Sequence, residues 1–207
     1  MAYLGAADTF TDLTGWPGSY GSARTVVAGR ARVTSDVVPN YTGLERTNGP
    51  LTGNNILVEV PTVAPATGVT TGGAFTGLWL QSATTAGTRL GFRYNAVTGV
   101  LSCAVQVGYD DTSTTDLTYS ATTHRWWQVE HTGTAVVWST SPDGATWTTR
   151  RTLGTPPAWT ATANTLVALE TYRDSGTVSF AEFDNVNTPT AVAPTVPDTG
   201  FLAFFGL

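Results

Sequence analysis

The stretch that decides the fold is His124–Trp147, HRWWQVEHTGTAVVWSTSPDGATW. Side chains alternate between the two faces of a β-strand, and residues 132–134 form a hairpin-length break between two such strands. In the turn at residues 141–144, Pro presets φ, Asp can bond its own backbone, and Gly accepts a positive φ. The stretch therefore predicts two strands and the start of a third, with four large apolar residues in the core: Trp127, Val129, Val136 and Trp138.

The same alternation predicts strands along the rest of the chain, at residues 28–33, 54–60, 77–82, 89–94, 100–107, 166–172 and 177–183. Residues 39–43, 61–73 and 108–123 are polar or rich in turn formers, and we predict loops there. Sustained helical periodicity is not found in any long window. Many strands separated by turns predict an all-β fold, a β-sandwich or jelly roll.

Composition narrows the classes of partner. The 207 residues carry a net charge of −5 with only 12% charged residues, and every one of the ten basic residues is Arg. A net negative charge argues against the basic surface that nucleic-acid binding needs. No apolar run is long enough to span a membrane. Residues 1–10 lack the features of a secretory signal, so we expect synthesis in the cytosol. The single cysteine, Cys103, excludes an internal disulfide and is expected to be a small buried hydrophobe.

Several of these segments together resemble a known domain family. GLWLQS, RLGFRY, the opening stretch and the closing FAEFDNV are similar to the concanavalin A-like (laminin-G/glucanase-type) jelly roll, over about residues 8–186. The resemblance implies one domain at residues 1–187, in which the last strand returns beside the first and Phe183 packs near Phe10 or Trp16. Because this fold hosts lectins, glycosidases and structural domains, it leaves the function open.

The acidic residues argue against an enzyme. Glycoside hydrolysis usually needs two carboxylates. Residues 182–187, EFDNVN, are similar to the Glu-x-Asp-x-x-Glu strand of glucanases of this fold, but Asn187 replaces the last acid. Glu130 and Glu170 are a second candidate pair, without a spacing rule to support them. His124 and His131 lack partners at metal-ligand spacing and are expected to be solvated or hydrogen-bonded strand residues. We therefore expect no catalytic residues.

We also expect no cofactor and no metal site. The alternative is structural calcium, because carboxylate oxygens are the ligands that calcium prefers. Three acids fall in the predicted loop at residues 108–123: Asp110, Asp111 and Asp116. Their spacing differs from that of an EF-hand, and acidic loops are usually solvated.

One sheet face has the composition of a sugar-binding surface. If the apolar partners on each strand face the core, the alternation places an aromatic-plus-amide set on the opposite face, where rings stack on sugars and planar polar groups orient hydroxyls. This predicted glycan-binding set is Trp79, Gln81, Arg93, Gln106, Trp126, Gln128 and Glu130. The alternative is that loops or a neighbouring subunit cover this face.

The C-terminal segment points to an assembly. Residues 188–207 form a Pro-rich linker that ends in an apolar tail. Such a tail either folds back on its own domain or docks onto a partner, and we expect docking. Its docking residues are Phe201, Leu202, Phe204, Phe205 and Leu207. The opening MAYLGAADTFTD, the lysine-free composition rich in Ala, Thr, Gly and Val, and the closing FDNV resemble minor tail or capsid-decorating proteins of actinobacteriophages. This implies a virion protein, as a homo-oligomer with a trimer favoured, that is anchored to other virion proteins and displays its jelly roll to host-surface carbohydrate. The alternatives are a free carbohydrate-binding module or lectin, and a glycoside hydrolase.

Overall fold

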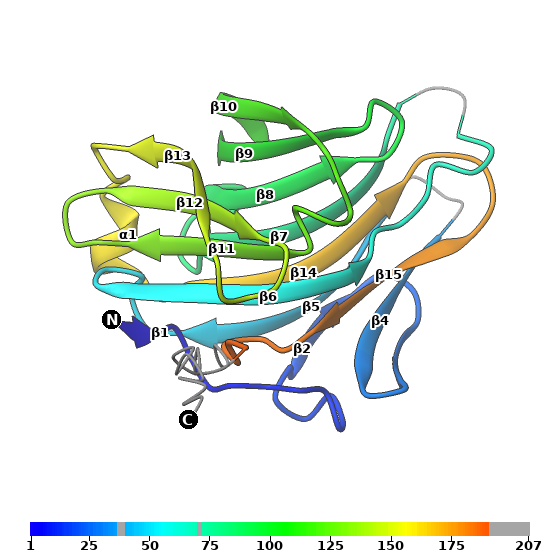
Figure 1. The fold of residues 1–207 in the computed structure, drawn as a ribbon, viewed down its shortest axis with the longest axis horizontal. Helices are drawn as coiled ribbons and strands as arrows, with labels where there is room; N and C mark the ends of the chain where they lie inside the picture. Colours follow the sequence, from blue (N-terminus) through cyan, green and yellow to red (C-terminus); the bar gives the residue numbers. More distant parts are fainter. Residues whose placement is uncertain (37–39, 70–71, 191–207) are drawn as a thin grey trace, which may run out of the picture.

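The computed structural model describes residues 1–36, 40–69 and 72–190 (Figure 1). The domain predicted at residues 1–187 is covered apart from two short gaps. The apolar docking residues of the predicted tail lie outside the described residues: Phe201, Leu202, Phe204, Phe205 and Leu207.

Two β-sheets pack face to face (Figure 1). The seven-stranded sheet has the order β10-β9-β8-β7-β14-β5-β2, and all its pairs are antiparallel. Its strands are β2 (Gly18–Tyr20), β5 (Asn40–Asn48), β7 (Ala74–Ser82), β8 (Arg89–Asn95), β9 (Val100–Val107), β10 (Asp110–Thr118) and β14 (Thr165–Arg173).

The eight-stranded sheet has the order β13-β12-β11-β6-β15-β4-β3, and β1 adds a short parallel pairing with β6. A four-residue helix, α1 (Trp159–Thr162), precedes β14. The strands of this sheet are β1 (Ala2–Tyr3), β3 (Arg24–Val27), β4 (Arg30–Ser35), β6 (Asn54–Thr62), β11 (Trp126–His131), β12 (Val136–Ser141), β13 (Thr148–Leu153) and β15 (Ser179–Asp184). The all-β, two-sheet fold predicted from the sequence is confirmed.

The core lies between the two sheets. The four core residues predicted from the opening stretch are all fully buried: Trp127, Val129, Val136 and Trp138. A buried indole N–H usually finds a hydrogen-bond acceptor. Trp127 Nε1 donates to the carbonyl oxygen of His124 at 2.8 Å, and Trp138 Nε1 donates to the carbonyl oxygen of Gly91 at 2.9 Å. The second bond joins β12 of one sheet to β8 of the other.

Two loop predictions are wrong. Residues 40–48 form β5, where Thr42 and Arg46 point inward and hide the apolar alternation that marks other strands. Residues 110–118 form β10, which lies at the edge of its sheet, with most of its residues exposed. A polar edge strand buries too little apolar surface to show a period-2 pattern. The apolar alternation that marks a strand was therefore missing from the sequence of both β5 and β10.

The two ends of the domain meet, as the resemblance implied. Asp8 forms an isolated antiparallel bridge with Val186, and Phe10, Trp16 and Phe183 share the buried core. Cys103 is buried as predicted, and burial raises the pKa of its thiol to about 12. Among the described residues, no helix is long and apolar enough to cross a membrane.

Candidate functional site

A pocket lies on the outer face of the seven-stranded sheet, opposite the core, over a row of three small residues and one flat-lying tryptophan. One register row across β14, β7, β8 and β9 reads Ala168, Trp79, Gly91 and Ala104. Trp79 is fully buried and packs with Ala104 and Ala168. A Cβ at Gly77 would lie 2.6 Å from Trp79 Nε1, so the indole ring lies flat over that glycine. The row therefore makes a low apolar floor between taller side chains.

Arg89 crosses this floor. Its guanidinium lies 4.1 Å from the centre of the Trp79 ring, a distance typical of a cation–π contact. Arg89 Nη1 donates to the Glu170 carboxylate at 3.2 Å, and Arg89 Nε donates to Gln106 Oε1 at 2.6 Å. The side chains of Arg89 and Glu170 are each 6% exposed. The buried charge of each is thus paired, as burial requires.

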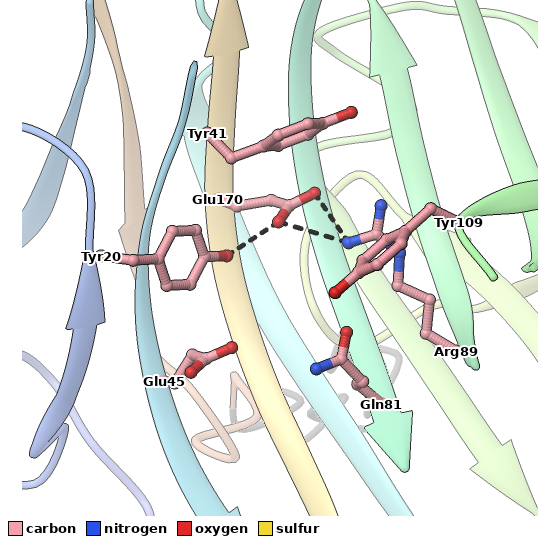
Figure 2. A pocket seen from close by; sticks show the side chains of 7 residues that line it. All are labelled: Tyr20, Tyr41, Glu45, Gln81, Arg89, Tyr109 and Glu170. Atoms are coloured by element: carbon pink, nitrogen blue, oxygen red, sulfur yellow. Dashed lines mark hydrogen bonds and ion pairs between the residues drawn. The ribbon is translucent and has the colours of Figure 1, made fainter. Parts of the chain in front are cut away.

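Tyr20 completes the bonding of Glu170 from two strands away. Tyr20 stands opposite Gly43 on β5, and Glu170 stands opposite the same glycine from the other side. The phenol reaches across this glycine and donates to Glu170 Oε2 at 2.8 Å (Figure 2). A Cβ at Gly43 would lie 2.4 Å from the Tyr20 hydroxyl oxygen, so the contact requires glycine here. Burial, reinforced by the Glu170 charge, raises the pKa of Tyr20 far above its usual value.

A hydrogen-bonded chain continues from Arg89 toward the sheet edge. Gln106 Nε2 donates to Asp111 Oδ1 at 2.6 Å, and Arg93 Nη2 donates to Asp111 Oδ2 at 2.5 Å. The chain therefore joins side chains of β2, β14, β8, β9 and β10. Its members hold one another in fixed geometry, so the pocket is preorganised rather than assembled on binding.

Tyr109 overhangs the pocket from a strained turn. Val107 pairs with Asp110, which leaves Gly108 and Tyr109 as a two-residue hairpin loop between β9 and β10. Both residues have positive φ, 64° and 70°, as a type I′ turn requires. An aromatic residue with φ in this region is uncommon and costs free energy. Tyr109 is nonetheless 57% exposed, and the Arg89 guanidinium lies 5.3 Å from its ring centre.

Tyr41 begins an aromatic wall on the other side. The ring centres of Tyr41 and Tyr172 are 4.5 Å apart, and those of Tyr172 and Phe75 are 5.4 Å apart. Such contacts are common between aromatic residues that face each other across neighbouring strands. Tyr41 is 36% exposed, so part of its ring faces the pocket. Two aromatic side chains on different elements, Tyr41 and Tyr109, thus stand over the space above Arg89 and Glu170 (Figure 2).

Two polar side chains in this cavity remain open to a ligand. The cavity has a volume of about 380 Å³. Glu45 and Gln81 line it on the side away from Tyr41, and neither side chain has a hydrogen bond or ion pair with another described residue (Figure 2). Burial, with a smaller contribution from the Glu170 charge, raises the pKa of Glu45 above its ordinary value. The lining residues are Tyr20, Tyr41, Glu45, Gln81, Arg89, Tyr109 and Glu170.

The predicted glycan-binding set is divided between the two sheets, so the prediction of one shared face is wrong. Trp79, Gln81, Arg93 and Gln106 lie on the seven-stranded sheet, whereas Trp126, Gln128 and Glu130 lie on β11 of the other sheet. Alternation shows which residues of a strand share a face, but it does not show which sheet the strand joins.

The two tryptophans of that set are buried. Trp79 is covered by Arg89, and Trp126 is only 4% exposed. Neither indole is therefore available as a stacking surface. Gln81 is the residue of the set that lines the cavity. Gln106 contributes indirectly, because its Oε1 accepts a hydrogen bond from Arg89 Nε.

The acids and histidines considered in the sequence are held in structural roles. Glu182 is bonded by Arg30, Arg32 and Thr62 on the eight-stranded sheet. Asn187 donates to the carbonyl oxygens of Leu4 and Gly5, which closes the domain.

Glu130 and Glu170 lie on different sheets, so they do not share a groove. His124 and His131 each accept a backbone hydrogen bond at Nδ1, and burial lowers the pKa of both. His131 is a strand residue as predicted, whereas His124 lies before β11 and outside any strand.

The three acids of the calcium alternative do not form a cluster. Asp110, Asp111 and Asp116 lie along β10 rather than around a loop, and Asp111 is paired with Arg93. Within the part of the chain that the structure describes, no three His, Cys, Asp or Glu side chains gather as a metal site.

Most of the pocket was missed in the sequence. Tyr20, Tyr41 and Glu45 belong to β2 and β5, which show little apolar alternation, and Tyr109 lies in what was predicted as a loop. One signal was present: Gly108-Tyr109 follows an apolar strand, and a two-residue turn containing glycine is typical of a hairpin.

Comparison with solved structures places the fold. A laminarinase from Flavobacterium sp. UMI-01 is similar with a TM-score of 0.64 at 9% identity, covering 89% of this chain and 98% of that one. The CBM2 module of the evolved Dit of Lactobacillus casei BL23 phage J-1 is similar with a TM-score of 0.57 at 10% identity, covering 88% and 95%. The chain has the jelly-roll fold of these proteins.

A GH16 endo-β-1,3(4)-glucanase shares the fold as well, with a TM-score of 0.54 at 10% identity, covering 87% of this chain and 86% of that one. No protein-family model matches the sequence, and no curated protein matches it. Because hydrolases and a binding module share the architecture, the fold leaves the activity to be argued from the pocket.

Proposed function

We propose that the protein binds carbohydrate, without hydrolysing it, in the pocket between Tyr41 and Tyr109. The observation that carries this proposal is Tyr109, an exposed aromatic side chain held over preorganised polar groups by a strained turn. Strain of this kind tends to persist where function requires it. Aromatic rings pack against the apolar faces of sugars, while Gln81 and Glu45 offer planar groups for their hydroxyls.

The state of the two carboxylates favours binding over hydrolysis. Glu170 is 4% exposed, and both its oxygens accept hydrogen bonds, from Arg89 and Tyr20. A carboxylate that is buried and fully bonded is poorly placed to attack a sugar or to activate water. Glu45 is then the single free acid of the pocket, whereas glycosidases generally use two.

Glycoside hydrolysis is the second candidate, because Glu45 and Glu170 stand diagonally on neighbouring strands. Diagonal neighbours are roughly 7–8 Å apart, within the separation of about 6.5–9.5 Å found between the carboxyl groups of inverting glycosidases. Release of reducing ends from a polysaccharide panel by the wild-type protein, and its loss in Glu45→Gln, would establish hydrolysis. We expect no release from either protein.

A glycan array tests the binding proposal. We expect the wild-type protein to give signals that Tyr109→Asn loses and Tyr3→Asn keeps. Tyr3 is a matched control because it is an exposed tyrosine, at 38%, on β1 of the other sheet. Equal signals from all three proteins would exclude the pocket as the binding site.

We further propose that the domain is a phage virion component, displayed outward as a trimer. Support comes from the lysine-free composition, the Pro-rich linker with its apolar end, and the shared fold with a module of a phage Dit. A free lectin is the rival. Mass spectrometry of purified virions should detect this chain, and light scattering of the isolated protein should give three times the 21.7 kDa chain mass.

A variant of the same length tests the proposal that the tail anchors the protein to the particle. Replacing the five apolar docking residues at positions 201–207 with serine keeps the length of the tail and removes its apolar surface. We expect this variant to fold but to be absent from particles. Incorporation at the wild-type level would contradict anchoring through the tail.

A further inference from the structure

The carboxylate of Glu45 in the pocket is surrounded on its own sheet face by small or neutral residues. In the register row across the sheet, Gly18 of β2 lies opposite Glu45 on one side and Ala168 of β14 on the other. A Cβ at Gly18 would lie 3.0 Å from Glu45 Cβ, so a larger residue there would crowd the side chain. Along β5, the neighbours on the same face are Gly43 and Thr47, because side chains of a strand alternate. None of these four neighbours can neutralise a carboxylate.

The other charges of the pocket neutralise one another. Arg89 is the basic residue among those that line the cavity, and its guanidinium is paired with Glu170 at 3.2 Å. The hydroxyl of Tyr20 also donates to Glu170 rather than to Glu45. The pocket therefore keeps one uncompensated negative charge, on Glu45. Burial and the Glu170 charge both raise the pKa of Glu45, which is the direction expected of an acid without a cation beside it.

The Glu45 carboxylate is half-buried but open to the pocket. Its oxygens have no hydrogen-bond partner among the described residues, and neither oxygen is fully enclosed by protein. Figure 2 shows this carboxylate and the amide of Gln81 pointing toward the space between them. β14 lies between the strands that carry the two side chains. Because neighbouring strands are about 4.8 Å apart, the two backbones are separated by about 10 Å or more, which leaves room for a ligand.

The two tyrosine rings over the pocket favour a cationic ligand as well. The Arg89 guanidinium lies 5.3 Å from the ring centre of Tyr109 and 6.0 Å from that of Tyr41, so each ring already has a cation near it. The face of an aromatic ring attracts cations electrostatically. Tyr109 is 57% exposed and Tyr41 is 36% exposed, so both rings can contact a further cationic group.

We propose that this pocket prefers an amino sugar, whose ammonium group pairs with Glu45. The choice of a sugar rests on the proposed function, whereas the choice of a cation follows from the unpaired carboxylate. The ammonium donates charge-assisted hydrogen bonds to Glu45, and the rest of the sugar contacts Gln81 and Tyr109. Acetylation of an amine removes its positive charge, so an N-acetylated sugar loses this pairing.

An NMR titration of the full chain with three monosaccharides tests the preference: glucosamine, glucose and N-acetylglucosamine, at constant ionic strength and slightly below neutral pH. The side-chain amide of Gln81 and the Nε–H of Arg89 report on the pocket. We expect glucosamine to bind roughly tenfold more tightly than the other two, the fold-change typical of a hydrogen bond to a charged group. Equal affinities for glucosamine and glucose would overturn this inference and leave the proposed function intact. Unmoved signals with all three sugars would refute both.

A matched pair of variants locates the charge that sets the preference. Glu45→Gln keeps the shape of the side chain and removes its charge, and we expect glucosamine and glucose to bind this variant equally. Glu130→Gln is the control, because Glu130 is also half-buried but lies on β11 of the other sheet, and it should keep the full preference. A preference that survives in Glu45→Gln would contradict the proposal. If Glu45→Gln fails to fold, the comparison of sugars on the wild-type protein still decides.

Methylamine is the control ligand, because it carries the ammonium group without the sugar. We expect it to shift the pocket signals only at concentrations well above those of glucosamine. Shifts at the same concentrations would show a cation site that does not recognise the sugar, and would overturn the proposal.

Discussion

The substitution Tyr109→Asn should make the protein more stable and a poorer binder at once. A residue other than glycine in the left-handed region costs about 1–2 kcal/mol, whereas asparagine tolerates that region and is favoured in type I′ turns. Tyr109 has φ of 70° and is 57% exposed, so its ring contributes little packing to offset the strain. We expect the free energy of unfolding to rise by about 0.5–1 kcal/mol.

Binding should change in the opposite direction. Loss of one aromatic contact with a sugar ring should remove roughly 1–1.5 kcal/mol, comparable to the value of an aromatic pair, or up to about tenfold in affinity. Urea unfolding measures the first effect and calorimetric titration with the strongest glycan from the array measures the second. Binding that weakens only in step with lost stability would refute the reasoning, because the residue would then be structural.

Three further predictions concern the fold beneath the pocket. Gly43→Ala should destabilise the protein by about 1–3 kcal/mol, because its Cβ would lie 2.4 Å from the Tyr20 hydroxyl and break a buried hydrogen bond; Gly49→Ala, with no atom within 4 Å of its Cβ, is the control in urea unfolding. Cys103 should resist a thiol reagent in the native state and react in urea, since burial raises its pKa to about 12; fast native labelling would show that the core opens. Hydrogen bonds lower the pKa of Asp143 from 3.8 to about 2, so the stability it contributes is present above pH 4 and is lost as pH falls toward 2. The difference between the urea midpoints of wild-type and Asp143→Asn should disappear over that window, and a constant difference would contradict it.

The sequence predicted the sandwich because its central strands carry strong apolar alternation. The pairs Trp127/Val129 and Val136/Trp138 were assigned to the core correctly, and each is fully buried. Among the strands that were missed, β5 places Thr42 and Arg46 inward, and β10 lies exposed at an edge of its sheet. A local sequence pattern does not reveal a strand that is stabilised mainly by pairing with residues distant in the chain.

The pocket was largely out of reach of sequence patterns. It depends on Tyr20 crossing Gly43 to reach Glu170, a contact between residues 150 positions apart in the chain. The error over Trp126 has the same origin, because strand alternation cannot place β11 in one sheet or the other. Pairing between strands supplies that information, and only the structure records it.

The most direct test of the central claim is a chemical-shift map of the protein with the strongest glycan from the array. The account predicts that the largest shifts fall on the rings of Tyr41 and Tyr109 and on the side-chain amide of Gln81, with the β11 residues Gln128 and Glu130 unchanged. Largest shifts on β11, with the pocket residues unmoved, would contradict it.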